Sequence, residues 1–236
     1  MTALWTAALA AVAVAYVWRW RTVRGALPMR RMWAFVAGLA ALWAAVASPL
    51  AHMDHAHLTA HMVQHLVIMT VAAPLLLFGE PALVLLDKAP PWSPHPAICW
   101  IAGTFTVVVW HVPGVFELGM QWHGLQHATF LVAGLLFWLP VLQPRPTEYG
   151  WSRWWIVLYL FLATLPCDAL SAFLAFCGRV IYPHYGTMHH HAGGLSALDD
   201  QERAGALMWF WVTFAYLVPA ALVTVELLSS KDPVRA

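Results

Sequence analysis

The chain has 236 residues, of which 61% are hydrophobic and only 10% are charged. Soluble domains carry about 25% charged residues, so this composition excludes a soluble globular protein and indicates an integral membrane protein. The formal net charge is +1 and no basic tract is present, which excludes a nucleic-acid-binding surface.

A transmembrane helix needs about 20 mostly apolar residues. In chain order, the segments that approach this length are residues 2–18, 32–50, 58–78, 97–112, 123–142, 153–177 and 203–228. A short apolar run at 82–86, inside a proline-rich connector, is expected to lie at the interface or to re-enter the membrane. The sequence therefore predicts an all-α fold, with residues 1–236 forming a single polytopic membrane helical bundle of about seven transmembrane helices.

The longest predicted loop spans residues 178–202 and separates the last two spans. It carries His184 and the run His189, His190 and His191. Near its end, Ser196 followed three residues later by Asp199 is typical of a capping box and predicts the start of the last helix.

Basic residues predict the orientation of the bundle, because Lys and Arg concentrate in cytoplasmic connectors. The first connector is the most basic, with Arg19, Arg21, Arg24, Arg30 and Arg31. Alternate threading from there places ten of the twelve basic residues inside, with the N-terminus outside and the C-terminus in the cytoplasm. Of the thirteen histidines, all except His95 then lie in outer loops or outer halves of spans. Ligand-capable side chains gathered at one depth of a membrane protein usually mark a site.

Histidines at helical spacing begin two of the predicted spans. His57, His61 and His65 are four residues apart, which places them within an arc of roughly 80° on one helix face. His123 and His127 repeat this spacing at the start of the fifth span. An i, i+4 pair presents two nitrogens to one ion, and neutral imidazole is a good ligand for copper, zinc, iron and nickel.

We therefore predict a metal site where three helices converge at the outer end of the bundle. Its predicted ligands are His57, His61, His65, His111, His123 and His127. The predicted supporting residues or further ligands are Gln64, Met69, Asp168, Asp200 and His184. The structural alternative is that buried histidines are hydrogen-bonded packing residues between helices, and that the loop histidines are a solvated run.

Several separated motifs resemble one family of bacterial membrane proteins. They are His61-Met62-Val63-Gln64-His65 followed by Ala73-Pro74-Leu75-Leu76, then His111-Val112-Pro113, His123 to His127 running into Gly134 to Pro140, Ile181 to Tyr185, and Asp199-Asp200-Gln201. Over about residues 50–228, the chain resembles the multi-span CtaG-type cytochrome c oxidase assembly proteins.

The resemblance implies a membrane copper-binding assembly factor for haem–copper oxidases, not an enzyme. Its implied location is the plasma (inner) membrane of a bacterium, with the metal site facing the extracytoplasmic side. Its implied partners are cytochrome c oxidase subunits or other oxidase assembly factors, besides membrane lipid. The implied copper positions are His61, His65, His111, His123 and His127. No family pattern is matched by His52, His55, His57, His189, His190 and His191.

Three other functions stay open at this point. A membrane cytochrome would ligate haem axially through His61 and His127. A zinc enzyme would use Asp168, Asp199 or Glu117 as a base, although the chain has no HExxH motif. A metal transporter would use Asp168 as a relay, although paired broken helices do not occur in matching halves. The oxidation state of copper, the number of ions and the formation of a homo-oligomer are likewise left open.

Overall fold

The computed structural model describes residues 2–23, 28–86, 94–143, 152–188 and 195–229, and all regular structure in these ranges is helical. The longer elements are α1 (Thr2–Val23), α2 (Met29–Val46), α3 (Leu58–Val67), α6 (Pro96–Trp110), α8 (His123–Leu142), α9 (Trp154–Phe176) and α11 (Ala197–Ser229). The shorter elements are η1 (Pro49–His52), η2 (Ile68–Ala72), α4 (Ala73–Phe78), α5 (Pro81–Leu86), α7 (Pro113–Gln121) and α10 (Pro183–Met188). The prediction of an all-α fold is confirmed.

Within these ranges, six helices are long and apolar enough to cross a membrane, or seven if the bent pair α6 and α7 counts as one span. One of the six is the continuous rod α3–η2–α4, which covers residues 58–78 as predicted. The bend between α6 and α7 measures 87° and lies at His111 and Val112. Pro113 explains it, because a residue before proline is driven out of the helical conformation, and Val112 has φ −66° and ψ 124°.

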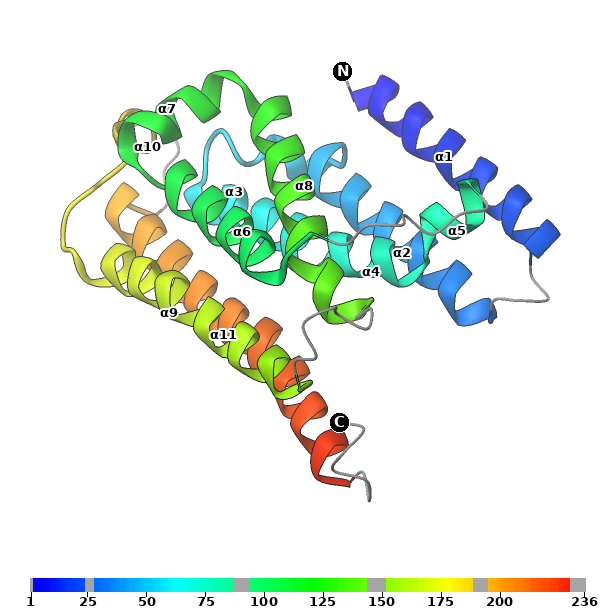
Figure 1. Cartoon of the computed structure of the whole chain (residues 1–236). Helices are drawn as coiled ribbons and strands as arrows, with labels where there is room; N and C mark the ends of the chain where they lie inside the picture. Colours follow the sequence, from blue (N-terminus) through cyan, green and yellow to red (C-terminus); the bar gives the residue numbers. More distant parts are fainter. Residues whose placement is uncertain (1, 24–27, 87–93, 144–151, 189–194, 230–236) are drawn as a thin grey trace.

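The long helices pack into a bundle in which α9 and α11 run side by side (Figure 1). Gly205 permits this contact, since a Cβ atom there would lie 2.7 Å from the backbone nitrogen of Ala175 and 2.9 Å from the carbonyl oxygen of Ser171. Aromatic side chains fill the interior, with Phe137 packing on both Tyr159 and Tyr216. In contrast, α1 lies at the edge of the bundle, against α2 and α5 (Figure 1).

The chain places different chemistry at the two ends of the bundle. At one end α3, α8 and α11 begin and α2 and α6 finish, and the clustered histidines lie there. At the other end Arg31 pairs with Glu80, Arg153 makes two 3.0 Å hydrogen bonds to Glu226, and His95 caps α6. Arg179 and Arg203 lie at the histidine end, so the separation of histidine from arginine is incomplete.

The segment predicted as the long loop 178–202 contains more helix than expected. It holds α10, and α11 begins at Ala197, directly after the predicted capping residue Ser196 and six residues before the predicted apolar span at 203–228. The capping box is confirmed: the Ser196 hydroxyl accepts from the Asp199 N–H at 3.1 Å, and the Asp199 carboxylate accepts from the Ser196 N–H at 3.2 Å. The run at 189–191 lies outside the described residues.

Candidate functional site: a histidine cluster at one end of the bundle

Four of the predicted ligands meet between α3 and α8, which begin at the same end of the bundle. The i, i+4 spacing brings the rings of His61 and His65 to 4.2 Å between centroids and those of His123 and His127 to 6.3 Å. Across the two helices, the rings of His61 and His123 are 6.4 Å apart and those of His65 and His127 are 5.9 Å apart. Metal–nitrogen bonds of about 2.0 Å place neighbouring ligand rings roughly 5 Å apart. The four rings lie near this spacing, but no three of these residues have ring nitrogens within 4.8 Å of one another, so binding one ion requires the rings to turn toward it.

Six ring nitrogens of this cluster are buried and have no hydrogen-bond partner in the described part of the chain. His61 is 0% exposed and His65 is 5% exposed. Both nitrogens of each ring, together with Nε2 of His123 and Nε2 of His127, have no hydrogen-bond partner among the described residues. Buried polar atoms in native proteins are nearly always satisfied, so several orphans in one place indicate a missing ion or solvent molecule.

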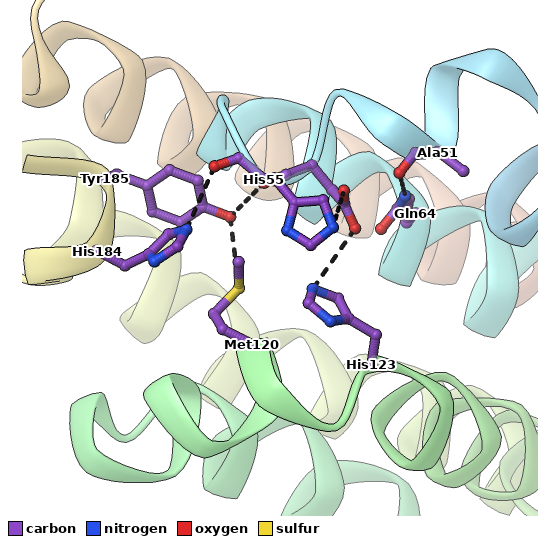
Figure 2. Close-up of polar contacts among 8 residues, drawn as sticks. Ala51, His55, Gln64, Met120, His123, His184 and Tyr185 are labelled. Atoms are coloured by element: carbon purple, nitrogen blue, oxygen red, sulfur yellow. Dashed lines mark hydrogen bonds and ion pairs between the residues drawn. The ribbon is translucent and has the colours of Figure 1, made fainter. Parts of the chain in front are cut away.

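A second group of ligands overlaps this cluster at its outer edge. Nε2 of His55 and Nε2 of His123 each lie 3.8 Å from the carboxylate of Asp54 (Figure 2). The ligand atoms of these three residues all lie within 4.8 Å of one another, the only such trio of His, Cys, Asp or Glu in the described ranges. Two imidazoles and one carboxylate suit a divalent transition ion, and His123 belongs to both groups.

A tyrosine and a histidine from α10 close the site over this trio. The Tyr185 hydroxyl donates a 2.7 Å hydrogen bond to the Asp54 carbonyl, and the His184 ring Nε2 lies 3.3 Å from the His55 carbonyl oxygen (Figure 2). Burial raises the pKa of Tyr185 far above its usual value, as it does for the neighbouring Tyr182. Tyr185 therefore stays a neutral donor that positions the Asp54 segment.

The start of α3 is held by a side chain from another helix. The buried carboxylate of Asp200 on α11 accepts hydrogen bonds from the Leu58 N–H at 2.6 Å, the Thr59 N–H at 3.3 Å and the Thr59 hydroxyl at 2.6 Å. A helix N-terminus has unsatisfied N–H groups and a positive partial charge, both of which a carboxylate compensates. Asp200 was predicted as a supporting residue or ligand, and its observed role is to fix the helix that carries His61 and His65.

Two predicted residues, His57 and Gln64, lie apart from the cluster. His57 has φ −133° and ψ 120°, so it precedes α3 instead of continuing the arc predicted for it with His61 and His65. With Gln64, it lines a separate cavity of about 460 Å³. The Gln64 amide donates to the Ala51 carbonyl at 3.1 Å, which ties α3 to η1.

Two further predicted residues lie deeper in the bundle. Asp168, in the middle of α9, interacts with Thr164 and Thr213. Met69 lies in η2, a π-helical turn whose Met69 carbonyl accepts a 2.9 Å hydrogen bond from the Trp138 indole. π-turns of this kind are frequent at functional sites.

Sequence reasoning missed three residues that belong to the site. Asp54 and His55 lie in the non-helical link before α3, where no periodicity signals them; an acid–histidine pair next to a histidine-bearing helix was the available clue. Gln126 is fully buried beside His65, between the two α8 histidines, and neither amide atom has a hydrogen-bond partner in the described part of the chain.

Comparison with known proteins identifies one family. The model of the cytochrome c oxidase caa3 assembly factor family matches residues 11–230, nearly the whole chain. This region includes every described histidine, and it begins well before the residues that carry the motif resemblance. No curated protein and no solved structure gives a significant match.

Proposed function

Since the chain belongs to the cytochrome c oxidase caa3 assembly factor family, we propose that it holds copper at the histidine cluster for insertion into the oxidase. The main support is the set of six buried imidazole nitrogens on His61, His65, His123 and His127 that have no hydrogen-bond partner among the described residues. Each unsatisfied buried polar group costs about 1–3 kcal/mol. A metal ion bound among these nitrogens would offset that cost.

The two overlapping ligand groups suggest how copper enters. The His55 side chain is 59% exposed, whereas its partner Asp54 is only 4% exposed. Copper arriving from solvent would meet the Asp54, His55 and His123 trio first. His123 would then pass it to the buried imidazoles. Overlapping sites favour release by ligand exchange, in contrast to a closed four-ligand cage that keeps its ion as structure.

Imidazole suits copper well, and a copper-containing oxidase requires this metal. In this proposal copper is cargo, and no turnover chemistry is needed. The histidine end faces the extracytoplasmic side of a bacterial plasma membrane, in agreement with the arginines at the opposite end.

The test compares the double variant His61→Ala/His65→Ala with His52→Ala, a control that removes an exposed histidine from η1. Cu(II) bound per purified protein and cytochrome c oxidase activity of the membranes are measured. The double variant is expected to insert normally, to retain less Cu(II) and to lose the activity, while the control retains both. Unchanged Cu(II) content in the double variant would overturn the assignment.

A further inference from the structure

A small internal cavity lies directly beneath the histidine cluster, enclosed by residues of α3, η2, α6, α8, α9 and α11. Its volume is about 30 Å³, which is room for one ion or one water molecule. Unlike the cluster above it, this cavity is rich in sulfur. The ligand-capable residues in its wall are Met62, His65, Met69, His111, Cys167 and Met208, and all six are buried.

One contact in this wall is difficult to explain as ordinary packing. Nδ1 of His111 lies 2.7 Å from the Val107 carbonyl oxygen, so Nδ1 carries the proton and donates it there. Nε2 of His111 is then an unprotonated acceptor, and it lies 3.3 Å from the Met62 sulfur. A thioether sulfur has no proton either. Two lone-pair donors therefore lie in contact, at a separation that suits neighbouring ligands of one cation.

The backbone around His111 fixes this ring. The bend between α6 and α7 ends the helix at His111, and the Tyr182 hydroxyl donates a 3.1 Å hydrogen bond to the His111 carbonyl. A ligating histidine commonly donates its other ring N–H to a backbone carbonyl, which orients the ring and sets the tautomer. The pair of bonds at Val107 and Tyr182 provides this support before any metal arrives.

We propose that this cavity is a Cu(I) site, in which Nε2 of His111 and the sulfur of Met62 are the first ligands and the Met208 thioether completes the coordination. Thioethers and thiols select soft ions such as Cu(I) over zinc, calcium or magnesium. The inference rests on the proposed copper function and deepens it. His65 lines both the cavity and the imidazole cluster, so it links the entry site for copper to a deeper, sulfur-lined one.

The test uses the full chain in detergent with Cu(I) under ascorbate. X-ray absorption at the copper edge reports whether sulfur is bound, and protein labelled with selenomethionine converts copper–sulfur into copper–selenium scattering. We expect sulfur scattering in the native protein and selenium scattering in the labelled protein. Scattering from nitrogen and oxygen alone, or sulfur scattering that persists after labelling, would overturn the thioether site.

Variants locate the site independently. Met62→Leu/Met208→Leu preserves side-chain volume, and Met32→Leu is the matched control, a buried methionine in a different core cluster. Loss of supporting groups alone typically costs 10–100-fold in metal affinity, so the double variant should lose at least about tenfold in competition with a Cu(I) chelator. The control should bind as the native protein does. Equal affinity of all three proteins would refute the site.

The outcomes separate this inference from the proposed function. If His61→Ala/His65→Ala abolishes Cu(II) retention but the native protein shows no thioether scattering, the imidazole cluster stands and the deeper site falls. If the methionine variant loses Cu(I) while the histidine variant keeps its Cu(II), the cavity stands and the imidazole assignment falls.

Discussion

The strongest prediction about folding stability concerns Asp200→Ala, which removes the cap of α3. The native carboxylate accepts three hydrogen bonds from Leu58 and Thr59, and Leu58 is only 1% exposed, so solvent does not readily replace the lost acceptor. A hydrogen bond to a charged group contributes about 1.5–3 kcal/mol, and an unsatisfied buried donor costs about 1–3 kcal/mol. Since these contributions overlap, we expect a loss of about 3 kcal/mol.

For a chain of 150–250 residues, 1 kcal/mol changes the melting temperature by about 2–4 °C, so a loss of about 3 kcal/mol lowers Tm by about 6–12 °C. The assay is thermal unfolding in detergent followed by tryptophan fluorescence. Asp199→Ala is the matched control, because this neighbouring carboxylate is exposed and caps only its own helix. Equal melting temperatures for Asp200→Ala and Asp199→Ala would refute the reasoning. We also expect Asp200→Ala to retain less copper, because His61 lies in the first turn of α3.

Three further changes test other contacts. Gly205→Val should prevent recovery of folded protein, because the Cβ atom would lie 2.7 Å from the backbone of α9. The control Gly186→Ala should be tolerated, because the nearest atom to its Cβ would be 3.7 Å away. Size-exclusion chromatography compares the two variants. Trp138→Phe removes the donor to the η2 carbonyl and should cost about 1 kcal/mol, with faster hydrogen exchange in η2 as its signature. Tyr185→Phe should cost a similar amount, about 1 kcal/mol, and weaken Cu(II) binding in titrations, because the hydroxyl positions Asp54. Unchanged exchange or unchanged Cu(II) affinity would contradict the last two.

The transmembrane helices were predictable because their length and apolar character are local properties. The rod at 58–78 and α8 at 123–142 agree with the predicted ranges. The i, i+4 spacing was also sufficient to bring His61 to His65 and to suggest that α8 carries a second pair. Local periodicity does not reveal where a helix begins, so His57 was wrongly placed on the α3 face.

The contacts that could not be predicted from the sequence join residues that are far apart in the chain. The cap of α3 comes from Asp200, more than 140 residues later, and the carbonyl of the π-turn at Met69 is drawn to Trp138, 69 residues later. The contribution of Asp54 requires the non-helical link before α3 to fold back over α8, which no sequence period encodes. These contacts are properties of the assembled bundle, and they determine which side chains share a site.

The most direct test of the central claim is electron paramagnetic resonance of the Cu(II)-loaded protein, prepared with ordinary histidine and with ¹⁵N-histidine. Imidazole coordination predicts resolved nitrogen splittings whose pattern changes with the isotope, and a pattern from fewer coupled nitrogens in His61→Ala/His65→Ala. A spectrum that is insensitive to the histidine isotope would show that copper is bound elsewhere and would contradict the account.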